Sequence, residues 1–321
     1  MAWGAWPALG HQPWATDDGD GAHLESAHAP PDVDPQGLNS ATRAQARTAL
    51  AAGCCPLRSS PCLHYHAARR NNALFKELNM ASFDHIILNG RPGGGKSELI
   101  DFIKKTPIDE RRELFHIGDF VELDDFVWLW DKFVEDDLWE QLGEKRLYSR
   151  RHEHGYVQLE GDKLLDMLIS KFNVTIKTNY AGQPGFYDDN TIFIEFARGV
   201  ADGGFKRAYE LLDEDILARS AILYISVSYA ESQRKNEARY QEALKHSILA
   251  HRLPEESIIR FSSEHDWEAI TDGAAEGYMD IKGVRVPFVT MNNEPELHDA
   301  ALLNARYGNA LTALKRLYLA R

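Results

Sequence analysis

Eight consecutive residues carry the clearest chemistry, because they match the pattern G-x-x-x-x-G-K-[ST]: Gly90, Arg91, Pro92, Gly93, Gly94, Gly95, Lys96 and Ser97. Glycines at these places let the backbone curl so that its N–H groups point at phosphate oxygens, and a following helix N-terminus adds positive potential. We expect Lys96 to reach the β- and γ-phosphates of a nucleotide and the Ser97 hydroxyl to bind Mg²⁺. An apolar run precedes the motif and an amphipathic stretch follows it, as this mechanism requires.

Two adjacent acids, Asp124 and Asp125, follow the second expected strand. Ligands bind at the carboxyl ends of parallel strands, so an acid there can contact a phosphate acceptor or act as its base. The alternative is helix capping, because an Asp before the apolar stretch 126–133 is what a helix start needs. Both roles stay open, and the two residues can divide them.

The order of the elements indicates an α/β protein. Apolar runs at 83–88, 114–117, 191–196, 221–227 and 286–291 are the strand candidates. Helical patterns separate them at 126–133, 161–172, 205–220, 230–251 and 296–319. Strands and helices in alternation predict a parallel sheet covered on both faces. The polar, aromatic-rich segment 138–156 breaks the alternation, and we expect it to be an insertion over the substrate side.

From about residue 83 to 292 the chain resembles the P-loop kinases that include nucleoside monophosphate and deoxynucleoside kinases. The phosphate-binding motif is the specific part of this resemblance, and the rest is the order and spacing of elements. The resemblance implies a three-layer P-loop NTPase fold with a parallel sheet of about five strands, a helical insertion and a lid. It also implies ATP and Mg²⁺ as cofactors.

The apolar run that ends at Glu195 resembles a Walker B strand, whose carboxylate orients the Mg²⁺ shell or activates the nucleophile. Deoxynucleoside kinases carry a comparable Glu with Arg directly after it, whereas two residues intervene here before Arg198. By this resemblance Glu195 belongs to the metal and catalytic set, and Arg198 steadies developing charge. The alternative is a structural Glu–Arg pair.

The segment 228–251 follows the fourth strand, where these kinases place a mobile lid with arginines for the transferred phosphate. Arg234 and Arg239 are the candidates, and Lys235 shares a helix face with Arg239. A solvated charged helix is the alternative. Asn292 and Asn293 follow the last strand, where such kinases often contact the adenine or ribose, although a plain turn explains them equally well.

Composition limits the classes of function. A formal net charge of −13 argues against nucleic acid as a partner. No run has the length of a membrane span, and the first residues lack the pattern of a secretory signal. The cysteines lie outside the expected folded part, at Cys54, Cys55 and Cys62. We therefore expect a cytoplasmic protein without disulfides or structural zinc.

The chain divides at about residue 80. Residues 1–79 contain seven of the thirteen prolines and a single lysine, and no hydrophobic period persists in them. We expect either a disordered tail or translated sequence upstream of a start at Met80. Residues 80–321 are the expected domain.

Together these features predict a Mg²⁺- and ATP-dependent phosphotransferase acting on a small molecule such as a nucleoside or nucleotide. An ATPase that uses hydrolysis for conformational work is one alternative. A non-catalytic, nucleotide-dependent binding protein is another, although the base-reading N-K-x-D of GTPases is absent.

Overall fold

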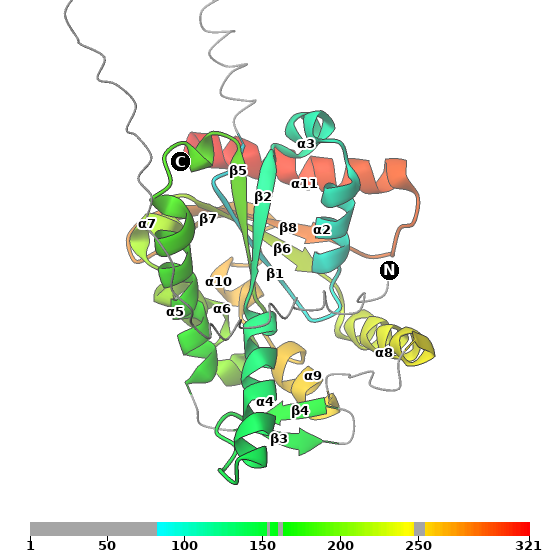
Figure 1. Cartoon of the computed structure of the whole chain (residues 1–321). Coiled ribbons are helices and arrows are strands. Elements are labelled where there is room, and N and C mark those ends of the chain that lie inside the picture. Colours follow the sequence, from blue (N-terminus) through cyan, green and yellow to red (C-terminus); the bar gives the residue numbers. More distant parts are fainter. Residues whose placement is uncertain (1–81, 153–154, 160–162, 247–253) are drawn as a thin grey trace, which may run out of the picture. The chain divides into compact units, whose positions relative to one another are not determined.

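The computed structural model describes residues 82–152, 155–159, 163–246 and 254–321 (Figure 1). All of them belong to one compact unit. The predicted disordered segment 1–79 lies outside the described residues, so both explanations of it stay predictions. No helix in the described part of the chain is long and apolar enough to cross a membrane.

A six-stranded sheet in the order β2-β5-β1-β6-β8-β7 forms the centre of the fold. Five strands are parallel, and β7 runs antiparallel to β8 at one edge. The strands are β1 (His85–Gly90), β2 (Asp119–Asp124), β5 (Asn190–Glu195), β6 (Ser220–Ser226), β7 (Glu276–Ile281) and β8 (Val284–Asn292). The predicted α/β class with a mainly parallel sheet is confirmed, and β7 adds a strand that the apolar pattern did not reveal.

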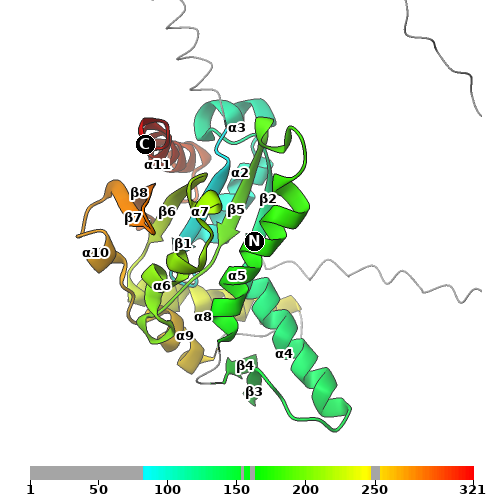
Figure 2. The ribbon, with the colours of Figure 1, turned by 90° about the vertical axis from the view of Figure 1, so that its left-hand side faces the viewer.

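Helices cover both faces of the sheet (Figures 1 and 2). Alternate residues of β1 enter different cores: Ile86 and Leu88 join one, and Ile87 joins the other. The first core is closed by α2 (Lys96–Lys105), α3 (Ile108–Phe115) and α11 (Ala300–Ala320). The second is closed by α5 (Leu164–Ile176), α6 (Gly204–Leu211), α7 (Glu214–Leu217) and α10 (Trp267–Ile270). Since both faces are buried, the central strands read as nearly continuous apolar runs, and the layers are helix, sheet, helix.

The strand predicted at 114–117 is wrong. Residues 108–115 form α3, and the second strand begins only at Asp119. Phe115 and Ile117 are apolar because they fill the core beneath the sheet from the end of α3 and the loop that follows. The true strand β2 lies at the sheet edge and exposes Glu122, so its apolar signal is weak.

The helical character expected for the insertion at 138–156 is also wrong, while its placement as an insertion stays a prediction. The segment contains the end of α4 (Asp125–Gln141), a loop, and a hairpin of β3 (Ser149–His152) and β4 (Gly155–Gln158). The buried carboxylate of Asp136 accepts hydrogen bonds from three consecutive backbone N–H groups, at 147–149, and from the Ser149 hydroxyl. These contacts hold the chain extended. Figure 2 shows the hairpin between α4 and α9 (Glu255–Ser262).

All five predicted helices have other limits in the structure: 126–133 lies within the longer α4, and α5 and α11 begin a few residues later than predicted. The pattern at 205–220 contains α6 and α7, because the Asn173 side chain donates to Leu211 O and accepts from Asp213 N and so ends α6. Ser220 already belongs to β6. The predicted lid segment 228–251 contains α8 (Tyr229–His246), and its end lies outside the described residues.

Candidate active site

The segment 90–97, which we call the glycine-rich loop, joins β1 to α2 at the carboxyl edge of the sheet. Gly90 and Gly95, the two glycines that the motif fixes, have φ angles of 146° and 106°. A β-carbon on Gly90 would lie 2.4 Å from Ile225 O, and one on Gly95 would lie 2.2 Å from Asn293 Nδ2. Both positions therefore require glycine for conformation and for space.

Lys96 lies over the glycine-rich loop. Its Nζ donates to Gly90 O and Arg91 O, each at 3.3 Å, and is 3.7 Å from Glu195 Oε1. The Lys96 side chain is only 8% exposed. The Lys96 ammonium thus lies between the loop backbone and the Glu195 carboxylate at the end of β5.

Glu195 and Asp124 are register partners at the ends of the neighbouring strands β5 and β2. Burial raises the pKa of Asp124 well above its usual range, and the charges of Glu195 and Asp125 raise it further. Burial also raises the pKa of Glu195, although nearby Lys96 opposes this. Two carboxylates are therefore crowded at the carboxyl ends of neighbouring strands, with the Lys96 ammonium close to them.

The two acids left open by the sequence have different partners. Asp124 Oδ1 accepts from Phe126 N at 2.8 Å and caps α4, as the capping alternative predicts. Asp125 pairs with Arg198, with Oδ2 and Nη2 2.6 Å apart and both side chains no more than 5% exposed. Capping uses only one Asp124 oxygen, so this acid can still contact an acceptor.

Arg198 faces protein atoms on several sides. Besides Asp125, it donates to Ala197 O at 2.6 Å and to Leu165 O at 3.1 Å. A buried ion pair exists here, as the structural alternative predicts, but its acid is Asp125 rather than Glu195. Arg198 would have to leave this pair in order to contact a phosphate.

The first half of α8 lies against the glycine-rich loop. Ser232 Oγ donates to Pro92 O at 2.6 Å, and Asn236 Nδ2 donates to the same oxygen at 3.3 Å. Arg239 pairs with Glu98 in the first turn of α2. The segment predicted to be a lid therefore touches the loop through uncharged side chains and touches α2 through an arginine.

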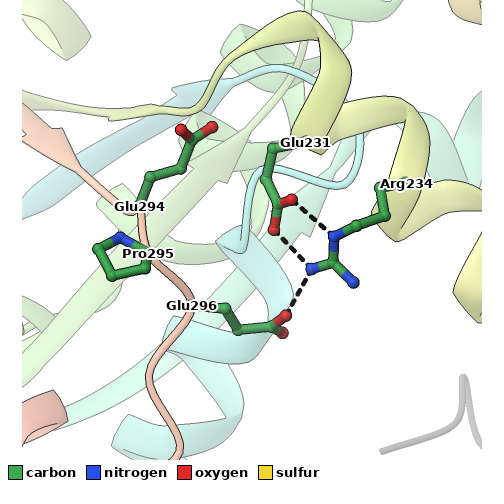
Figure 3. A pocket seen from close by; sticks show the side chains of 5 residues that line it. All are labelled: Glu231, Arg234, Glu294, Pro295 and Glu296. Atoms are coloured by element: carbon green, nitrogen blue, oxygen red, sulfur yellow. Dashed lines mark hydrogen bonds and ion pairs between the residues drawn. The ribbon is translucent and has the colours of Figure 1, made fainter.

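A surface pocket of about 500 Å³ lies between the start of α8 and the chain after β8, and Figure 3 shows the side chains that line it. Arg234 crosses it, with contacts of 2.6 Å to Glu231 and 2.7 Å to Glu296. Glu294 and Pro295 complete the lining. Arg234 is 54% exposed, so its two carboxylate partners can be exchanged for others at small cost.

Asn293 connects this segment to the glycine-rich loop. Its Nδ2 donates to Gly94 O at 2.9 Å, and its Oδ1 accepts from Arg306 Nη1 at 3.0 Å. The side chain is buried. Its observed contact is thus to the loop backbone, whereas the sequence left open a contact to adenine or ribose and a plain turn.

The sequence analysis did not predict the hydrogen bonds of α8 to the glycine-rich loop, nor the ion pair that Glu98 makes with α8. Ser232 and Asn236 are spaced i, i+4 on one helix face, whereas the sequence prediction of a lid rests only on the positively charged residues of this segment. The contact of Glu98 could have been predicted, because an acid in the first turn of the helix after the motif lies where an arginine of a lid would meet it. Ser97 is half-buried beside Lys96 in that same turn.

No known family model matches the chain, and no curated protein matches it. Among solved structures, the crystal structure of APE1195 is 13% identical and covers 72% of this chain and 98% of its own, with a TM-score of 0.34. The unliganded structure of a sugar kinase from Janibacter sp. HTCC2649 is 10% identical and covers 73% and 98%, with a TM-score of 0.29. Likeness at this level carries no argument, so the function has to be inferred from the site itself.

Proposed function

We propose that this chain has a P-loop NTPase fold and acts as a Mg²⁺- and ATP-dependent phosphotransferase on a small molecule. The observation that carries the proposal is the position of Lys96. Its ammonium lies against the carbonyls of the glycine-rich loop and 3.7 Å from the Glu195 carboxylate at the next strand end. A cation between a glycine-rich turn and a strand-end acid is what binding and transferring a terminal phosphoryl group needs.

The strand order supports this proposal. From β1 the chain crosses to β2 on one side of the sheet, and from β6 it reaches β8 on the other side. In open α/β sheets, ligands bind at the carboxyl ends of the strands where the order reverses in this way. The glycine-rich loop begins at the end of β1, next to that reversal.

The residues present fit a nucleotide with Mg²⁺. The loop has no room for side chains at its glycines, since a β-carbon on Gly94 would lie 2.9 Å from Arg91 O. The Ser97 hydroxyl and the carboxylates of Glu195 and Asp124 are hard oxygen donors, which Mg²⁺ prefers. A cation would also favour the ionised forms of these two acids, whose pKa values burial raises.

Magnesium, when bound, would neutralise charge on the phosphates. The residues of the chain would do the remaining work. Lys96 would hold the terminal phosphates, and Glu195 or Asp124 would take the proton from an acceptor hydroxyl. Arg234 and Arg239 would exchange their carboxylate partners for oxygens of the transferred group as α8 closes.

An ADP-release screen with Mg·ATP and panels of nucleosides, nucleotides, sugars and polar metabolites tests the proposal. We expect ADP only when the right acceptor is present, and none from Lys96→Ala. Equal ADP release with and without every acceptor would instead indicate an ATPase. Nucleotide binding without any release would indicate a non-catalytic binding protein.

A further inference from the structure

Two carbonyl groups of the glycine-rich loop accept hydrogen bonds from side chains outside the loop. Gly94 O accepts from Asn293, and Pro92 O accepts from Ser232 and Asn236. In a trans peptide the C=O and N–H groups point in opposite directions. A donor that fixes a carbonyl on one side therefore fixes the next N–H on the other side.

Gly94 O and the Gly95 N–H belong to the same peptide group. Gly95 is the N-cap of α2, and the first N–H groups of a helix have no partner within the helix. With Gly94 O held by Asn293, the Gly95 N–H points away from Asn293. Glycine at both positions leaves this peptide free to rotate, because no β-carbon restricts it.

Asn293 is itself held in one orientation. Its Oδ1 accepts from Arg306 Nη1, which also donates to Pro295 O at 3.0 Å. Arginine can only donate and a carbonyl can only accept, so this network fixes the Asn293 amide with its NH₂ toward Gly94. The side chain is 5% exposed, so water does not compete freely for these bonds.

We propose that Asn293, oriented by Arg306, is a positioning residue that turns the Gly94–Gly95 peptide so that its N–H faces the bound phosphates. This inference rests on the proposed function, and it assigns to the end of β8 a part in phosphate binding rather than in contact with the base. Folding already fixes the orientation of this peptide, so nucleotide binding does not have to include the free-energy cost of turning it.

Two variants of Asn293 test the inference. Asn293→Asp keeps the shape and the Arg306 contact but replaces the donor with an acceptor, which repels Gly94 O. Asn293→Ala removes the donor without adding charge. Asn309→Asp, at an exposed position of α11, is the matched control for the added charge. Cooperative thermal melts establish that each variant is folded.

The measurement is the dissociation constant, by calorimetry with Mg²⁺, of ADP and of inorganic pyrophosphate. We expect both Asn293 variants to bind both ligands roughly tenfold or more weakly, about 1.4 kcal/mol, and Asn309→Asp to match the wild type. Pyrophosphate has no base, so an Asn293 that served only the base would leave its binding unchanged.

Two results would overturn the inference. The first is a pyrophosphate affinity of both Asn293 variants within about twofold of the control, whether or not ADP binding is weakened. If Asn293→Asp does not fold, Asn293→Ala alone decides. A wild-type protein that binds neither ligand would overturn the proposed function, and the inference with it.

Discussion

Breaking the buried pair of Asp125 and Arg198 by removing one partner should strongly destabilise the fold. Both side chains are nearly inaccessible, and Nη2 and Oδ2 are 2.6 Å apart. Removing one partner leaves a buried charge without compensation, which costs about 3–5 kcal/mol, whereas an exposed pair contributes about 0–1 kcal/mol. We therefore expect Arg198→Met to lower the free energy of unfolding by about 3–5 kcal/mol.

Urea unfolding of a double-mutant cycle checks this magnitude. Asp125→Asn and Arg198→Met should each be strongly destabilising, and the double variant should be far less destabilised than their sum. Lys206→Met is the matched control, because Lys206 pairs with Glu210 on the surface. If Arg198→Met loses no more stability than Lys206→Met, Arg198 is not held as described and is available for phosphate.

Three further predictions concern pH, the strand-end acids and the lid. Burial lowers the pKa of His85 from 6.5 to about 4, so folding favours the neutral ring. Above about pH 6.5 this group should not lower the free energy of unfolding, whereas near pH 5 it should lower it by about 2 kcal/mol. His85→Gln should lose this pH dependence, measured by urea unfolding at each pH, and an equal change of the unfolding free energy with pH in both proteins would contradict the prediction. Glu195→Gln should lower kcat far more than ATP affinity in steady-state kinetics and binding assays, and the same pattern in Asp124→Asn alone would move the base to β2. Arg234→Ala and Arg239→Ala should each reduce kcat roughly ten- to a thousandfold while ATP affinity changes less than about tenfold, because both arginines pair with carboxylates and would contact the transferred group only once α8 closes; normal turnover in the double variant would remove the lid from the mechanism.

Local patterns allowed much of the fold to be predicted. The motif glycines dictate the loop conformation through their own φ angles, so Gly90 and Gly95 could be recognised without any tertiary contact. The central strands are buried on both faces and therefore have nearly continuous apolar sequences. The same reasoning missed β2, because an edge strand with Glu122 exposed is only partly apolar.

What depends on distant partners could not be predicted. The β3–β4 hairpin forms where the Asp136 carboxylate holds an extended chain, and no local signal in 147–149 reports that contact. Arg198 was expected near the phosphates because it follows Glu195, yet it pairs with Asp125 at the start of α4. The contact of Asn293 with Gly94 joins residues far apart in the sequence.

Titration of Mg·ATP into the wild type, Lys96→Ala and Lys104→Ala tests the central claim most directly. Lys104 is a half-exposed lysine in the last turn of the same helix, so it controls for lost charge on α2. We predict that Lys96→Ala binds roughly ten- to a hundredfold more weakly, the loss of charged hydrogen bonds of about 1.5–3 kcal/mol, and that Lys104→Ala binds like the wild type. Equal affinity of Lys96→Ala and the wild type would contradict the assignment of the glycine-rich loop as the phosphate site.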